Sequence, residues 1–167
     1  MLRSREGSRN AIEQLLTRWQ PRLWRYALRL TGREDAAWDV LQETRMSITQ
    51  GIRRLDDPVR FRRWAYTILT RRATDWRRRN ARAVPSADLH EVAGDDRLPD
   101  PPANVAMVRE AVARLPADRQ ALLALHYREE FEIWEMAEIL SIPEGTVKSR
   151  LFHARRQLRE IIERMQP

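Results

Sequence analysis

Apolar residues recur at every third or fourth position along most of this 167-residue chain, in two groups separated by a proline-rich segment. Such spacing predicts α-helices whose apolar sides face a common core. In the first group the expected helices span 10–30, 33–50 and 58–82, and in the second they span 103–114, 116–129, 131–140 and 143–165. Alternation typical of strands is absent and glycine is rare, so we expect an all-α fold.

Residues 83–102 differ in composition from both groups. They contain Pro85, Pro99, Pro101 and Pro102, and five acidic side chains against a single arginine. This composition is typical of a linker. We therefore expect a three-helix domain over 1–82 and a four-helix domain over 103–167, joined by a flexible linker. The acidic linker could fold back on a basic surface. The alternative that we favour is that its charge only keeps it solvated.

The last two predicted helices resemble a helix-turn-helix, with a three-residue turn between them. Steps of 100° from Val147 place Leu151 and Ala154 on one side and Phe152 near the opposite pole, among polar residues. An aromatic side chain on a polar face indicates a surface that meets a partner, here the DNA major groove. The side chains that suit base edges are Lys148, Ser149, Phe152 and His153. Those that suit phosphates are Arg150, Arg155, Arg156 and Arg159. Thr146 lies in the first turn, where backbone N–H groups favour a phosphate.

Positive charge is concentrated in one block. The chain carries a net charge of +7, and residues 53–82 alone carry +8, from 11 arginines and three aspartates. Such a block indicates a polyanionic partner, although a solvated helix face is the alternative. The chain has no cysteine, which excludes disulfides and thiolate chemistry. No run of 18 apolar residues or secretory signal is visible, so we expect no membrane insertion.

The helices predicted over 33–50 and 58–82 each have two faces. On the first, Asp35, Asp39, Gln42 and Met46 line up opposite the apolar side, beside Trp38 and Glu43. Acids next to an exposed Trp and Met suggest a protein-docking surface, against the alternative of an ordinary acidic face with Trp38 partly covered. On the second, one side is apolar, with Trp64 in the core, and the other can bind phosphates or single strands. Its members are Arg60, Arg63, Thr67, Thr70 and Arg77, while the roles of Tyr66 and Trp76 stay open.

Three stretches of sequence together resemble bacterial RNA polymerase sigma factors of the extracytoplasmic-function (ECF) group. LRLTGREDAAWDVLQET resembles that family's first helix pair, and FRRWAYTILTRRATDWRRR resembles its next helix. LPADRQALLALHYREEFEIWEMAEILSIPEGTVKSRLFHARRQLR is similar to its C-terminal domain. The IPEGTVKSRLFHAR segment is the most specific part of the resemblance, which covers most of the chain.

The resemblance implies a function for each domain. The first would bind core polymerase and recognise and melt the promoter −10 element, and the second would read the −35 element. Docking on the β′ clamp helices would involve Asp39, Gln42 and Glu43, with Asp35 and Met46 on the same helix face. The −10 DNA would contact the loop 51–57 and the following helix through Arg54, Leu55, Asp56, Arg60, Arg63, Arg77, Arg78 and Arg79.

The resemblance also implies partners: core RNA polymerase, including its β flap, promoter DNA, and an inhibitory anti-sigma factor that an exposed Trp38 or Trp134 could serve. We expect a cytoplasmic protein without cofactor, metal or catalytic site. Two alternatives are a free-standing regulator that uses only the helix-turn-helix, and a nucleic-acid enzyme with a catalytic acid pair. The acidic face over 35–46 argues against the first, and the lack of a ligand cluster in the sequence argues against the second.

Overall fold

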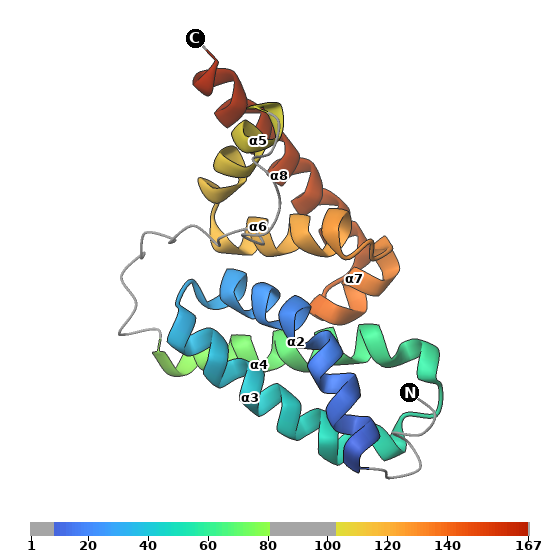
Figure 1. The fold of residues 1–167 in the computed structure, drawn as a ribbon. Helices are drawn as coiled ribbons and strands as arrows, with labels where there is room; N and C mark the ends of the chain where they lie inside the picture. The colour runs from blue at the N-terminus through green and yellow to red at the C-terminus, as the bar shows by residue number, and fades with distance from the viewer. Residues whose placement is uncertain (1–8, 81–102, 167) are drawn as a thin grey trace.

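The computed structural model describes residues 9–80 and 103–166, and all of its regular structure there is helical. This confirms the all-α prediction, while the predicted linker, 83–102, lies outside the described residues. Within these ranges the N-terminal domain has three long helices and two short 3-10 turns, and the C-terminal domain has four helices and one π-helical turn. Figure 1 shows their arrangement. In chain order these are α2 (Arg9–Thr31), α3 (Glu34–Gly51), η1 (Ile52–Arg54), η2 (Pro58–Arg60) and α4 (Phe61–Asn80), then α5 (Ala103–Ala113), α6 (Ala117–Leu123), η3 (Ala124–Arg128), α7 (Ile133–Leu140) and α8 (Glu144–Met165). None of the helices in these ranges is long and apolar enough to cross a membrane.

The N-terminal domain packs α2, α3 and α4 around one apolar core. The predicted inner side of α3 is confirmed, because its apolar positions and one threonine are all buried: Ala37, Val40, Leu41, Thr44 and Ile48. The third helix, expected from residue 58, begins there as the 3-10 turn η2 and becomes α-helical at Phe61. The Asp57 carboxylate caps this turn by accepting a hydrogen bond from the Val59 N–H at 2.9 Å. A carboxylate at this position satisfies a helix N–H that has no partner within the helix.

The buried surface of α4 is wider than the row of apolar residues along it predicts. Thr70, expected on the exposed side, is buried, and its hydroxyl lies 3.3 Å from that of Tyr26. Tyr66, whose role was open, is fully buried between the rings of Tyr26 and Phe131. The reason is tertiary: Phe131 belongs to the C-terminal domain, so α4 has packing partners on two sides.

The helix expected over 116–129 is interrupted. It ends as α6 at Leu123, continues as the π-turn η3, and closes with Glu130 in a left-handed conformation at φ 50°. The Phe131 N–H then bonds the Leu125 carbonyl at 3.0 Å, which ends the turn before α7 begins. The three-residue turn predicted between α7 and α8 is confirmed as 141–143, with Ser141 at φ 54°.

Ser141→Gly is expected to stabilise the protein by about 0.5–1 kcal/mol. A left-handed conformation strains any residue with a Cβ. Glycine removes this strain, and we expect the gain in free energy to exceed the cost of the greater conformational entropy that glycine gives the unfolded chain. Ser141 is exposed, so its side chain contributes little packing. Urea unfolding measures the change, and Ser141→Ala is the control because it keeps the strain. A lower midpoint for the glycine variant than for the alanine variant would contradict this prediction.

The two domains pack against each other, with α6 on α2 and α7 on α4. Figure 1 shows this arrangement: α6 runs across the blue α2, and α7 approaches the N-terminal domain. The sequence pattern did not indicate this contact, and the expectation of two separate modules did not include it. Some of the residues in this contact also belong to the candidate binding surfaces.

Candidate nucleic-acid interface

Helix α8 presents the predicted recognition surface to solvent. Val147, Leu151 and Ala154 are buried against the rest of the domain, as the 3.6-residue period predicts. Phe152 is 62% exposed, and its ring meets that of His153 edge-on, with centroids 5.6 Å apart. A large aromatic ring left in water is available for apolar contact with a base. The other predicted −35 residues are exposed, apart from the half-buried Thr146: Lys148, Ser149, Arg150, His153, Arg155 and Arg156.

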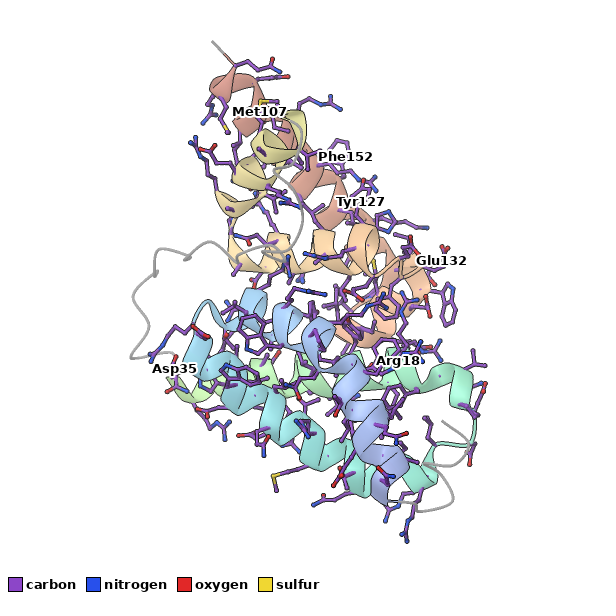
Figure 2. All side chains as sticks on the ribbon, viewed as in Figure 1. Arg18, Asp35, Met107, Tyr127, Glu132 and Phe152 are labelled. Atoms are coloured by element: carbon purple, nitrogen blue, oxygen red, sulfur yellow. The ribbon has the colours of Figure 1, made fainter. Side chains whose placement is uncertain are left out.

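Tyr127 extends this surface beyond α8. It lies in η3, is 61% exposed, and the Arg155 guanidinium sits over its ring at 5.4 Å from the centroid. Figure 2 shows Tyr127 and Phe152 on the same edge of the C-terminal domain. Tyr127 could not be predicted from the sequence, because its orientation depends on the π-turn η3 and the apolar pattern predicts an unbroken helix there.

The outer face of α3 carries the predicted acidic surface. Asp35, Asp39, Gln42 and Met46 are exposed, and Glu43 is half-buried. Arg33 forms an ion pair with Asp35. Hydrogen bonds from Arg33 and from the backbone N–H of Ala36 hold the pKa of Asp35 below its usual value. Asp35 is therefore ionised and already paired, in contrast to Asp39 farther along the same face, which has no ion pair within 4 Å among the described residues.

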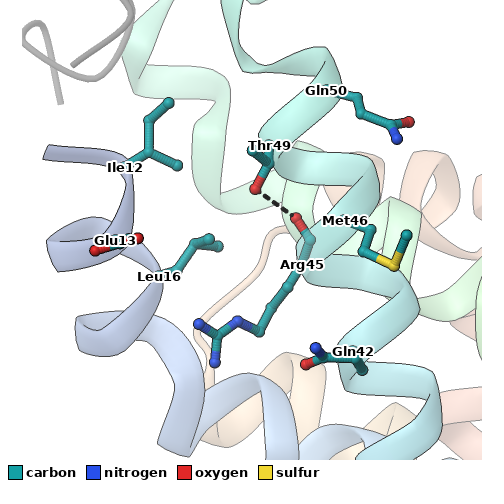
Figure 3. Close-up of a pocket in the computed structure, with 8 residues that line it drawn as sticks. All are labelled: Ile12, Glu13, Leu16, Gln42, Arg45, Met46, Thr49 and Gln50. Carbon is teal, nitrogen blue, oxygen red and sulfur yellow. Dashed lines mark hydrogen bonds between the residues drawn. The ribbon is translucent and has the colours of Figure 1, made fainter. Parts of the chain in front are cut away.

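Trp38 and an open pocket flank the acidic face. Trp38 is 45% exposed, and its other side packs on Trp24, with ring centroids 5.6 Å apart. At the other end of the face, α2 and α3 enclose a pocket of about 500 Å³ (Figure 3). Met46 and Gln42 lie on its α3 side and Leu16 on its α2 side. Exposed apolar atoms beside carboxylates are typical of protein-binding surfaces.

The connection from α3 to α4 contains the residues predicted to contact −10 DNA. Arg54, Asp56 and Arg60 are exposed, and Arg60 Nε lies 3.6 Å from a carboxylate oxygen of Asp57. Leu55 differs, because its side chain is 9% exposed and belongs to the core. In this conformation Leu55 holds the turn in place, and only its neighbours face solvent.

Most of the α4 arginines predicted to contact DNA form ion pairs, and their exposure differs. Arg79 reaches Glu43 of α3 at 3.3 Å, which links the arginine row to the acidic face. Arg77 forms an ion pair with Asp118 of α6 in the other domain. Arg63 is the most covered of the predicted set, with its side chain only 16% exposed beneath α7. Arg78 is exposed.

Both halves of the chain match known sequence families. Sigma-70 region 2 matches residues 15–83, and Sigma-70, region 4 matches residues 106–158. The ECF RNA polymerase sigma factor SigL of Mycobacterium tuberculosis is 37% identical over 150 residues, which cover 86% of this chain and 84% of that protein. SigM of the same species is 34% identical and covers 93% of this chain and 79% of its own length.

A solved structure with a similar fold spans both domains. It is the sigma factor RpoE of Bartonella quintana in complex with the anti-sigma factor NepR, with a TM-score of 0.69 and 25% identity. The alignment covers 90% of this chain and 96% of that one. Since both regions match in their expected order and two relatives above 30% identity align along most of the chain, it belongs to the ECF sigma factors of bacterial RNA polymerase.

Proposed function

We propose that the chain binds core RNA polymerase and directs it to promoters by recognising a −10 element with the N-terminal domain and a −35 element with the C-terminal domain. One observation carries the proposal. A single chain combines an exposed recognition helix with an acidic docking face and an arginine-rich helix. A free-standing regulator needs the first surface and has no use for the second.

The proposed contacts follow from exposure and chemistry. Asp35, Asp39, Gln42, Glu43 and Met46 would meet the β′ clamp helices. Arg54, Asp56 and Arg60, with the arginines of α4, would hold the opened −10 strands, where phosphates attract guanidinium groups. In α8, the exposed Lys148, Ser149, Phe152 and His153 would meet base edges of duplex −35 DNA, and the neighbouring arginines would contact phosphates. The C-terminal domain would also contact the β flap.

The proposal includes a regulator and a location. The solved relative is bound to an anti-sigma factor, and the half-exposed Trp38 beside the acidic face gives such an inhibitor an apolar contact on this chain. We place the protein in the cytoplasm, where core polymerase and promoter DNA meet. The chemistry of RNA synthesis would belong to the polymerase, and the chain itself would act as a non-enzymatic specificity subunit.

Run-off transcription with core polymerase on a library of randomised promoters tests the proposal. The expected result is transcripts that start at fixed positions, from templates enriched in two short elements separated by a constant spacer. Transcription that is no more selective than with core enzyme alone would overturn it. A pull-down with core polymerase distinguishes a sigma factor from a free-standing DNA-binding regulator, because the polymerase would not retain the regulator.

A further inference from the structure

The ring of Tyr127 lies against the proposed recognition helix without being part of that helix. Tyr127 belongs to η3, and the Arg155 guanidinium of α8 lies over its ring at 5.4 Å from the centroid. Both side chains are exposed, and Figure 2 shows Tyr127 on the same edge of the C-terminal domain as Phe152. Tyr127 thus joins a second structural element to the surface proposed for −35 DNA.

The structure around Tyr127 fixes where its ring lies. The Phe131 N–H donates a hydrogen bond to the Leu125 carbonyl at 3.0 Å, which closes the chain around the π-turn that contains Tyr127. The His126 ring meets the Tyr127 ring edge-on, with centroids 4.8 Å apart. An exposed ring that is held in this way is preorganised for binding, because little conformational freedom remains to be lost when a ligand arrives.

Arg155 and Tyr127 lie at the edge of the proposed recognition surface. Arg155 follows Phe152 by three residues, which places it about 60° around α8 from the ring proposed to meet a base. Tyr127 contacts Arg155 from the neighbouring element η3. When a recognition helix enters the major groove, its exposed face meets base edges, and the phosphates lie along both sides of the groove. Side chains at this edge are therefore placed to contact the DNA backbone.

Arg155 and Tyr127 both have hydrogen-bond donors available for a phosphate. Arg155 forms no ion pair within 4 Å in the part of the chain that the structure describes, whereas Arg156 Nε lies 3.5 Å from a carboxylate oxygen of Glu160. The Tyr127 hydroxyl has no hydrogen-bond partner among the same residues. A guanidinium and a phenol O–H both donate hydrogen bonds to phosphate oxygens. Two such donor groups therefore lie together at this edge.

A purely structural role accounts poorly for the contact between Tyr127 and Arg155. In a structural pair of the same kind, the Arg62 guanidinium lies 4.0 Å from the ring centroid of Phe131, which is buried. A cation–π contact in water contributes much less than one from which water is excluded. The exposed pair therefore adds little to the stability of the fold. Its main effect is to restrict the Arg155 side chain, whose freedom would otherwise be lost when it met a phosphate.

We infer that Tyr127 and Arg155 form a phosphate-binding pair that contacts the DNA backbone at the edge of the −35 site. Tyr127 has two roles in this pair. Its ring positions the Arg155 guanidinium, and its hydroxyl donates a hydrogen bond to the backbone. The inference rests on the proposed function, because it places the pair beside an α8 that lies in the major groove. It adds a DNA contact from η3, outside the helix-turn-helix.

Duplex binding by the full chain tests the phosphate-binding pair with variants that separate its two roles. Tyr127→Phe removes only the hydroxyl, and Tyr127→Ala also removes the ring. Each is combined with Arg155→Ala and, as the matched control, with Arg164→Ala. Arg164 is exposed on the same helix, about 180° around it from Arg155, so its variant loses the same charge away from Tyr127. The probe is a random-sequence duplex of about 20 base pairs at low salt, because phosphate contacts do not depend on sequence.

Tyr127→Phe is expected to weaken binding about threefold without changing the slope of log affinity against log salt, since it removes one uncharged donor. Tyr127→Ala is expected to weaken binding about tenfold and to reduce that slope, because Arg155 is then held at the phosphate less often. Arg155→Ala should therefore cost less affinity in the Tyr127→Ala chain than in the wild type, and its full cost should return in Tyr127→Phe. Arg164→Ala should cost the same in all three.

Wild-type affinity in Tyr127→Phe would overturn the hydroxyl contact, and an equal cost of Arg155→Ala with and without the Tyr127 ring would overturn the positioning role. Circular dichroism checks that each variant is folded, and Tyr127→Phe keeps the ring contact with His126 if Tyr127→Ala is destabilised. The random duplex needs no promoter, which separates the two proposals. A chain that shows the coupling but does not direct transcription would overturn the proposed function, and one that directs transcription without the coupling would overturn the phosphate-binding pair.

Discussion

Phe152→Ala is expected to change which base pair is preferred at one position of the −35 element, at a cost of roughly 1–3 kcal/mol for the preferred base. The ring is 62% exposed and belongs to no core cluster, so its loss leaves the fold intact. Its removal also takes away the edge contact that positions His153. Binding to a library of −35 duplexes at fixed salt measures the effect, and Lys148→Ala should act in the same way at another position.

Arg155→Ala is the matched comparison on the same helix. We expect it to weaken binding to all duplexes alike and to reduce the slope of log affinity against log salt by about 1, because it removes a phosphate contact. Arg155 also covers Tyr127, so part of the loss reflects the release of that ring. If Arg155→Ala altered base preference and Phe152→Ala did not, the assignment of the two faces of α8 would be wrong.

The second large effect is expected from Asp39→Arg combined with Gln42→Ala. Both side chains are exposed on the outer face of α3, so the change should not unfold the domain. If this face is the centre of the polymerase interface, reversing its charge should cost roughly 2–4 kcal/mol of binding free energy, or about 30- to 1,000-fold in affinity. Titration of labelled core polymerase measures the affinity, and run-off transcription should fall in proportion.

Asp75→Arg provides the control for this charge reversal. Asp75 is exposed on α4 of the same domain, and the substitution changes the net charge by the same amount as Asp39→Arg. We expect it to keep near wild-type affinity for polymerase. The Asp39 variant should also keep its affinity for −35 duplex, which involves the other domain. Equal losses of polymerase binding in both variants would mean that overall charge, and not the acidic face, governs the affinity.

Helical periodicity correctly predicted the helices that are buried on one side only. Helix α3 packs on α2 and α4 from one side, so its inner residues, such as Val40 and Ile48, and its outer residue Asp39 follow the 3.6-residue repeat. In α8, the same repeat correctly predicted that Phe152 is exposed and that Leu151 is buried in the core of the C-terminal domain. Asp57 followed by Pro58 is a typical helix start, and the Asp57 carboxylate caps the turn before α4.

Features that depend on contacts between distant segments could not be predicted in this way. Thr70 and Tyr66 lie on a side of α4 that a second packing partner covers, and nothing within α4 reports where Phe131 will be. Arg63 was expected on an open basic face but lies beneath Trp134 for the same reason. Leu55 follows the 3-10 turn η1 in a connection too short to show a period, so its burial was not visible in the pattern.

Two left-handed residues lie near the ends of α7, Glu130 three positions before its first residue and Ser141 directly after its last. Helix α7 also packs on α8 and is joined to it by the short turn 141–143, so we expect the two helices to move together. Parting the domains would therefore carry the recognition helix along without changing its internal geometry. Substitutions at Trp134 or Glu138, whose side chains contact Arg63 of α4, should leave the ranking of −35 sequences unchanged.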